Sequence, residues 1–277
     1  MKKTFLRDLV VGTISAQPFR VKNWLLRRHP RFLLGLLFRL EPGDVVISPA
    51  GPSSFRFLMK MQWQAHTEYV LGIYEPEFFQ VLRRHLRPGD TCVDVGGHLG
   101  YYSMLMARLV GPGGRVITFE PVQENIAVLE ENLAMNHMDN VRLVNTALGR
   151  CSGTMTLVRS ESETMSATPS IRAYAVEGSQ KQVEVNVDTL DAFLDRNGCR
   201  PKLIKIDVEG AEIEVLLGAM KTLANSHPVV MVEIHGWGEA SNREVLDLFS
   251  SLHYSVSVVG TRGHEAFCVA IPNGNGA

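Results

Sequence analysis

The chain has 277 residues, 45% of them hydrophobic, which is enough for one large α/β domain with an extension. Its formal net charge is −1, and we expect no nucleic-acid partner. The four cysteines lie far apart and form no C-x-x-C pair, which argues against a structural zinc site and favours a reducing compartment.

The N-terminal arm differs in charge from the rest of the chain. Residues 1–40 hold nine Lys or Arg residues against a single Asp, so the remainder is acidic. The most apolar run, residues 32–38, has seven residues, whereas a membrane-spanning helix needs roughly 20. We therefore expect a cytoplasmic protein without a transmembrane span. For residues 24–40 we favour a helix packed on the main domain, and the alternative is peripheral contact of residues 20–40 with a membrane surface.

Strand and helix patterns alternate from residue 91 onwards. The expected strands are residues 91–96, 115–120, 141–147, 153–159, 182–187, 202–208, 229–235, 255–260 and 265–271, and the expected helices are residues 103–110, 122–136, 188–197, 211–225 and 241–252. Asp188 is placed to cap the helix that starts beside it. We expect residues 160–181 to form a polar loop, and loops of this length inside a compact domain more often have a function than none. Strand–helix units that end in two consecutive strands predict a mostly parallel sheet with one antiparallel strand and helices on both faces.

A glycine-rich turn follows the first of these strands. Gly96, Gly97 and Gly100 leave room for a tight bend and for close approach of a ligand. Asp94 places a carboxylate at the carboxyl end of the strand, where open α/β sheets bind ligands. The turn is not the G-x-G-x-x-G of a nicotinamide site, and His98 stands where the related G-x-G-x-G form has its central glycine. A carboxylate here suits a ligand with positive groups, such as S-adenosylmethionine.

Two further positions complete the candidate nucleoside site. Glu120 ends the second strand, where its carboxylate can accept both hydroxyls of a ribose. Nicotinamide and adenosylmethionine sites both use such an acid, so Glu120 does not choose between them. Ala147 ends the third strand, where a backbone amide could meet an adenine edge.

The ends of the fourth and fifth strands are rich in ionisable residues. Strand alternation puts Lys205 and Asp207 on one side, and it likewise pairs Glu233 with His235. Buried charges are expensive unless they are paired, so a role in a site is a better explanation than stability. An acid and a histidine beside another acid can form a general base with its orienting partner, or a metal site.

The chain resembles the FkbM family of S-adenosylmethionine-dependent methyltransferases over about residues 68–270. The resemblance rests on Gly72-Ile-Tyr-Glu-Pro-Glu77, Pro88-Gly-Asp90, Val93-Asp-Val-Gly-Gly-His-Leu-Gly-Tyr-Tyr102, Phe119-Glu-Pro121, Ala147-Leu-Gly149, Lys205-Ile-Asp-Val-Glu-Gly-Ala-Glu212 and Val232-Glu-Ile-His235. The Lys205–Glu212 run is highly characteristic, whereas the glycine turn is shared by much of the superfamily. One departure is that the family usually reads Gly-Ala-Asn where this chain has Gly96-Gly97-His98.

The resemblance implies a Rossmann-like, seven-stranded class I methyltransferase fold with an N-terminal helical or β extension. The implied parts are a basic extension over residues 1–67, the methyltransferase domain over residues 68–272, and a disordered tail over residues 273–277. The implied contacts to S-adenosylmethionine are Glu75, Asp94, Gly96, Gly97, His98, Gly100, Glu120 and Ala147. In catechol O-methyltransferase, a more distant relative, acids at the corresponding ends of the fourth and fifth strands bind magnesium, which makes Asp207, Glu233 and His235 the candidate ligands here.

We therefore expect O-methylation of a small molecule, sugar or polyketide hydroxyl by direct displacement. The substrate oxygen must lose its proton, and the candidate catalytic residues are Lys205, Asp207, Glu233 and His235, with a histidine base titrating near about 6.5. The alternatives are a nicotinamide-dependent oxidoreductase and a methyltransferase-like binding module without catalysis.

Overall fold

The computed structural model describes residues 9–11, 13–14, 21, 24, 28, 43–47, 55–61, 68–72, 74–160, 180–236 and 240–273. The expectations for residues 24–40, for the loop 160–181 and for the C-terminal tail fall almost entirely outside these residues. Contacts divide the chain into two units, Met1–Pro76 with Val128–His137, and Glu77–Ala127 with Met138–Ala277. The expected boundary between residues 67 and 68 stays a prediction.

The first unit contains a β-hairpin held by asparagine side chains. Strands β1 (Gly43–Ile47) and β2 (Phe57–Met61) pair antiparallel. Helix α7 (Gln123–Met135) contributes Asn132, whose side-chain amide exchanges two hydrogen bonds with the backbone of Leu58, at 2.6 and 3.0 Å. Asn136 makes the same pair of bonds to the backbone of Arg56. These side chains therefore extend the edge of β2 as a further strand would.

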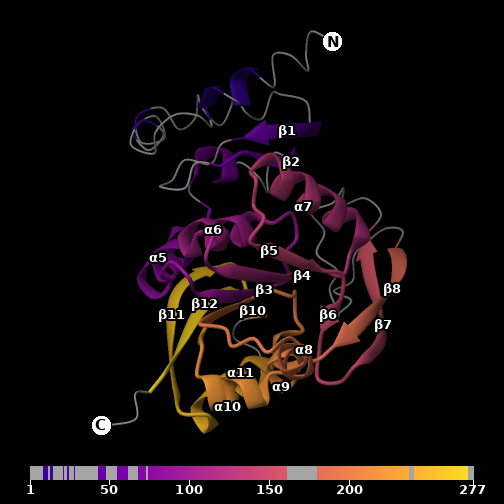
Figure 1. Ribbon diagram of the computed structural model, residues 1–277, viewed down its shortest axis with the longest axis vertical. Coiled ribbons are helices and arrows are strands. Elements are labelled where there is room, and N and C mark those ends of the chain that lie inside the picture. The colour runs from indigo at the N-terminus through magenta and orange to yellow at the C-terminus, as the bar shows by residue number, and fades with distance from the viewer. Residues whose placement is uncertain are drawn as a thin grey trace. The chain divides into compact units, whose positions relative to one another are not determined.

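The second unit is built on a seven-stranded sheet (Figure 1). Its strands are β3 (Thr91–Val95), β4 (Arg115–Phe119), β5 (Val141–Val144), β9 (Leu203–Ile206), β10 (Val229–His235), β11 (Tyr254–Arg262) and β12 (Glu265–Pro272). They lie in the order β11-β12-β10-β9-β3-β4-β5. β12 alone runs antiparallel to its neighbours β10 and β11. The expected fold, a mostly parallel sheet with one antiparallel strand, is confirmed.

Helices cover both faces of this sheet (Figure 1). α5 (Pro76–His85) and α6 (Tyr101–Val110) lie on one face, and α8 (Leu190–Asn197), α9 (Glu212–Leu217), α10 (Met220–Ser226) and α11 (Ala240–Ser251) lie on the other. On the second face, Phe193, Leu216 and Phe249 pack against the apolar side chains of the central strands. The central strands are buried on both faces, which explains why their sequences are almost continuously apolar. Among the described residues, no helix combines the length and the apolar composition needed to cross a bilayer.

A small three-stranded sheet lies beside the main one and corrects one expectation. The antiparallel pair is confirmed as β7 (Gly153–Ser160) and β8 (Gln180–Asp188). The strand expected over residues 141–147 is wrong in its length, because it ends at Val144 and a separate strand, β6 (Ala147–Leu148), pairs with β8. The side chain of Asn145 donates to the carbonyls of Glu120 and Pro121, each at 3.1 Å, and so turns the chain between β5 and β6.

The helix expected over residues 211–225 is in fact two helices, α9 and α10. The carboxylate of Asp191 accepts from the backbone amides of Lys221 and Thr222, each at 2.8 Å, and thereby caps the start of α10. Gly218, at the break, packs so closely that a Cβ would lie 2.0 Å from the carbonyl oxygen of Gly149. The cap of α8 also differs from expectation, since Thr189 rather than Asp188 accepts from the amide of Ala192, at 3.1 Å.

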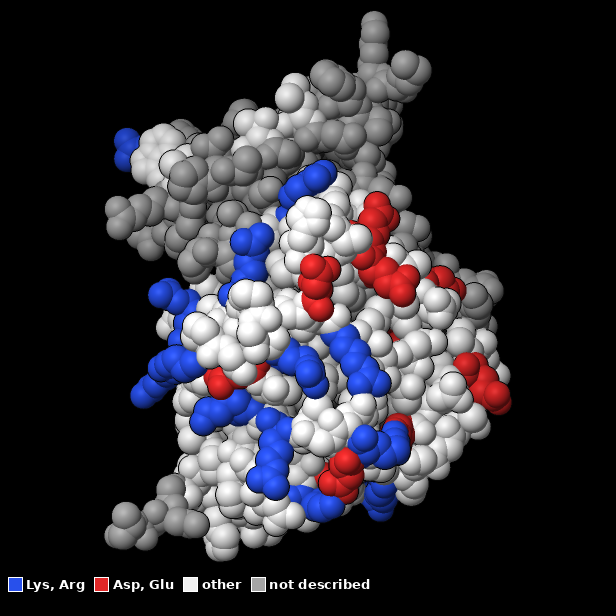
Figure 2. Space-filling model, viewed as in Figure 1, with Lys and Arg blue, Asp and Glu red and all other residues white. Residues whose placement is uncertain are grey.

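Basic side chains are numerous over the helices of the second unit. Figure 2 shows Lys and Arg spread over the face that includes α5 and α8. Arg83 and Arg84 lie in the last turn of α5, Arg108 in that of α6 and Arg196 in that of α8. Positive side chains are stabilising at helix C-termini because they complement the helix dipole, so these positions are explained by the helices themselves.

Candidate functional site

A pocket opens at the carboxyl ends of β3, β4 and β9, within the second unit. Its empty space, which includes the open mouth, is about 500 Å³. Its walls are mainly apolar, with carboxylates at two points. The lining residues are Val95, Gly96, Phe119, Glu120, Pro121, Thr146, Ala147, Leu148, Met155, Leu157, Asp207, Val208 and Ala211.

Glu120 is the first of the two carboxylates. The carboxylate Oε2 accepts from the backbone amide of His98 at 2.8 Å, and Oε1 accepts from the amide of Val122 at 2.9 Å and from Asn125 Nδ2 at 3.1 Å. Burial raises the pKa of Glu120, although the neighbouring His98 and these hydrogen bonds oppose the rise. A carboxylate offers about four acceptor positions, so Oε2 has capacity for a further donor from the pocket.

The glycine turn after β3 is shaped by a close approach to β9. Gly96 has φ +81°, and a Cβ there would lie 1.8 Å from the carbonyl oxygen of Asp207. The amides of Gly96 and Gly97 both donate to the carbonyl of Phe119, at 3.0 Å. His98 has φ 49°, a left-handed conformation that is uncommon outside glycine and is found at functional sites. Gly100, with φ 91°, stands at the N-terminus of α6.

Asp94 lies behind the pocket and is fully buried. The carboxylate Oδ2 accepts from Ser103 Oγ at 2.6 Å, and Ser103 Oγ in turn accepts from Thr118 Oγ1 at 2.9 Å. Oδ1 accepts no hydrogen bond from the described residues, and it lies 3.7 Å from Lys205 Nζ. Burial raises the pKa of Asp94, although Lys205 and the Ser103 hydrogen bond oppose the rise.

Lys205 connects Asp94 to the second carboxylate of the pocket. Its ammonium group lies 3.1 Å from Asp207 Oδ2 and 4.8 Å from the centre of the Tyr102 ring, and the side chain is only 2% exposed. Burial would raise the pKa of Asp207, but Lys205 and His235 outweigh it, so this pKa lies below its ordinary value. Asp207 is therefore ionised at neutral pH.

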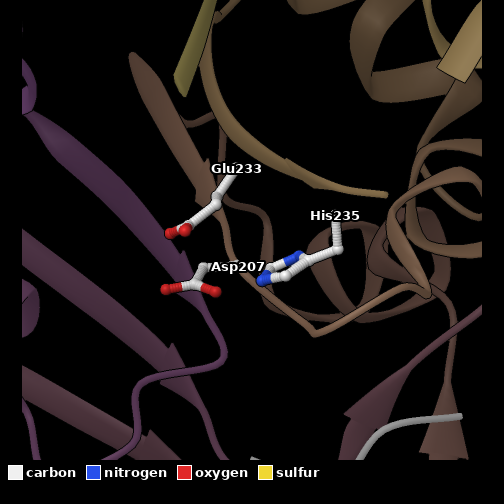
Figure 3. A group of neighbouring side chains, drawn as sticks. All are labelled: Asp207, Glu233 and His235. Atoms are coloured by element: carbon white, nitrogen blue, oxygen red, sulfur yellow. The ribbon is translucent and has the colours of Figure 1, made fainter. Parts of the chain in front are cut away.

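Asp207, Glu233 and His235 form a cluster beside the pocket (Figure 3). β9 and β10 are parallel neighbours, and one polar atom from each of the three side chains lies within 4.8 Å of the others. Figure 3 shows the side chains pointing toward one another from the end of β9 and from β10. The expectation that these two strand ends meet is thus confirmed.

His235 is surrounded by carboxylates. Its Nδ1 lies 2.8 Å from Glu212 Oε1, and its Nε2 lies 3.2 Å from Glu209 Oε2. Burial lowers the pKa of His235, but the bond to Glu212 and the charges of Glu209 and Asp207 outweigh it and raise that pKa to about 9. The imidazole is therefore protonated at neutral pH, whereas the sequence predicted a histidine base with a pKa of about 6.5.

Some of the residues predicted to contact the cofactor line the pocket. Among the described residues, its walls include Gly96, Glu120 and Ala147 but not Asp94, Gly97, His98 or Gly100, which support the turn or lie behind it. Glu75 is buried in the first unit with φ 41°, and its cofactor contact stays a prediction, as do the functional roles of the whole set.

Sequence reasoning missed the wall made by Met155 and Leu157. Both belong to β7, and alternation along that strand puts them on the same side. This alternation was visible in the sequence. The sequence could not show that the β7–β8 hairpin packs on Val122 and Ala147 and so closes the pocket.

Comparison with known proteins agrees with this geometry. The family described as Methyltransferase FkbM domain matches residues 94–256. Methyltransferase 1 of Beauveria bassiana (strain ARSEF 2860) is 27% identical over 148 residues, covering 47% of this chain and 59% of that protein. Methyltransferase sdnD of Sordaria araneosa is 30% identical over 154 residues, covering 46% of this chain and 59% of that protein. The chain thus spans about three fifths of the length of these relatives.

A solved structure is also similar. The crystal structure of methyltransferase FkbM from Methylobacillus flagellatus KT has 16% sequence identity and a TM-score of 0.47, and the match covers 76% of this chain and 53% of that one. The family match alone covers more than half of the 277 residues, and it includes the glycine turn, the pocket and the Asp207 cluster. The chain therefore belongs to the FkbM methyltransferase domain family.

Proposed function

We propose that the protein is an S-adenosylmethionine-dependent methyltransferase that methylates a hydroxyl of a small molecule, such as a sugar or a polyketide. The observation that carries the proposal is the pocket, in which an apolar cavity lies between the carboxylates of Glu120 and Asp207. Family membership supports the reaction class, and the acids next to the pocket support a hydroxyl acceptor.

The residues present fit S-adenosylmethionine. Phe119, Leu148 and Leu157 offer apolar surface for an adenine ring, and Glu120 Oε2 can accept from a ribose hydroxyl. Asp207 is ionised and stands at the same cavity, where it is available to the acceptor. When bound, S-adenosylmethionine supplies an electrophilic methyl group.

The chain's own residues then have two tasks. The first is to hold the acceptor oxygen in line with the methyl group at near-attack distance, which the rigid ends of β9 and β10 can do. The second is to receive the hydroxyl proton. Asp207 is the best placed acceptor, because it is ionised and lines the pocket, whereas His235 is already protonated.

The Asp207–Glu233–His235 cluster does not fit magnesium well. Magnesium prefers six oxygen ligands in a near-octahedral arrangement. Here the Lys205 ammonium lies 3.1 Å from Asp207, and both ring nitrogens of His235 face carboxylates. These contacts explain the cluster as internal charge pairing.

The two alternative functions have less support. The family match does not favour a nicotinamide-dependent oxidoreductase. A binding module without catalysis would have no use for an ionised acid held by a buried lysine at the pocket wall.

Calorimetry with S-adenosylmethionine, S-adenosylhomocysteine and NAD tests the cofactor. We expect binding of the first two and none of NAD; binding of NAD alone would overturn the proposal. Incubation with isotopically labelled S-adenosylmethionine and host extract, followed by mass measurement of labelled products, then identifies the acceptor. The control is Asp207→Asn, which we expect to bind the cofactor and to label product at least about 100-fold more slowly.

A further inference from the structure

The turn that follows β9 has an unusual backbone. Glu209 has φ 52° and the next residue, Gly210, has φ 100°, so two consecutive residues are left-handed. A residue with a side chain adopts this conformation at an energetic cost, and it persists only where the surrounding structure holds it. The same turn begins at Asp207, which is the carboxylate that lines the pocket.

Two carboxylates join this turn to His235. Glu212 Oε1 accepts from the amide of Gly210 at 2.7 Å and lies 2.8 Å from His235 Nδ1, and the Glu212 side chain is only 5% exposed. Glu209 Oε2 lies 3.2 Å from His235 Nε2. A carboxylate oxygen faces each ring nitrogen, and an imidazolium, which has an N–H at both positions, fits this arrangement.

We infer that His235 is a positioning residue, which together with Glu209 and Glu212 clamps the turn after β9 and thereby fixes Asp207 at the pocket. In this arrangement the imidazole takes no proton from the acceptor. The inference rests on the proposed function for its catalytic consequence, but the clamp itself is independent of any reaction.

Amide hydrogen exchange of the full-length protein tests the clamp. We expect His235→Ala and Glu212→Ala to speed exchange at Gly210 about tenfold, the usual effect of losing one hydrogen bond. His235→Asn should restore protection, because its amide can donate where Nδ1 does. Glu214→Ala is the matched control, since Glu214 lies on the same helix and pairs with Arg150 at the surface. Unchanged exchange at Gly210 in His235→Ala would overturn the inference, whatever Glu212→Ala shows, because Glu212 is itself the acceptor of the Gly210 amide.

Measurements of kcat distinguish a positioning role of His235 from proton transfer to its ring. We expect His235→Ala to lower kcat by up to about 100-fold with little change in S-adenosylhomocysteine affinity, because a small displacement of Asp207 suffices for such a loss. His235→Asn should recover most of the lost kcat, although asparagine cannot act as a base. Equal losses of kcat in both variants, together with a wild-type pH–rate profile that falls below a pKa of about 6.5, would show a histidine base and overturn the inference. If the wild type transfers no methyl group, the proposed function fails, and the exchange measurement still decides the clamp.

Discussion

The turns after β3 and β9 have the same construction but different charged neighbours. Each contains a glycine and a left-handed residue with a side chain, His98 in the first and Glu209 in the second. Each is held by a buried glutamate that accepts from a backbone amide of the turn, Glu120 from His98 and Glu212 from Gly210. The two turns differ in the other groups that contact the glutamate.

Glu120 receives hydrogen bonds from two backbone amides and an asparagine, whereas Glu212 also meets the protonated ring of His235. The first turn therefore keeps acceptor capacity that a ligand can use, and it lies on the pocket wall. In the second turn, Glu209 and Glu212 pair with His235, and Asp207 is the carboxylate that lines the pocket. We therefore predict that the first turn belongs to a binding half of the site and the second to a reacting half, and the variants below test this division.

The largest effect is expected from Asp207→Asn, in the reacting half. Loss of a general base lowers turnover roughly 10²- to 10⁴-fold, and cofactor affinity should change little. Steady-state kinetics and calorimetry on the same preparation measure the two effects. Dialysis of the wild type against a chelator should leave turnover unchanged; a loss that magnesium restores would instead make Asp207, Glu233 and His235 metal ligands.

Gly96→Ala should damage the contact between the two turns. The added Cβ would meet the carbonyl oxygen of Asp207 at 1.8 Å, and the backbone has φ +81°. We expect a loss of about 3 kcal/mol in the free energy of unfolding. Urea unfolding measures it, with Gly113→Ala as the control, because nothing lies within 4 Å of a Cβ at that position. Equal stability of the two variants would show that the turns do not constrain each other.

The pairing around His235 predicts a dependence of stability on pH. The folded-state pKa of His235 is raised to about 9 from its ordinary value of 6.5, so the stabilisation is fully present below pH 6.5 and is lost as the pH rises through 9. A shift of this size corresponds to about 3 kcal/mol at most. Urea unfolding at several pH values should show the stability difference between the wild type and His235→Asn shrinking as the pH rises from 6.5 to 9. A difference that does not vary with pH would contradict a protonated His235.

Local patterns predicted more of the reacting half than of the binding half. Alternation along β9 and β10 was enough to bring Asp207, Glu233 and His235 together, because parallel neighbours end at one edge of the sheet. Met155 and Leu157 escaped prediction, because their place in the pocket depends on how a distant hairpin packs.

The division of one expected helix into α9 and α10 had a similar cause. Asp191, 30 residues earlier in the chain, caps the second helix through the amide of Lys221. Hydrogen bonds of this kind override helix propensity and leave no local trace in the sequence.

Glu120→Ala should have the smallest of these effects and should be confined to binding. A charge-assisted hydrogen bond to a ribose hydroxyl contributes about 1.5–3 kcal/mol, so we expect the dissociation constant for S-adenosylmethionine to rise by about 10- to 150-fold. The variant also leaves the amides of His98 and Val122 without their acceptor, so its unfolding must be measured alongside calorimetry. Glu244→Ala is the matched control, since Glu244 is exposed on α11. A folded Glu120→Ala protein with wild-type affinity would remove Glu120 from the ribose site and leave it only the structural task of holding the first turn.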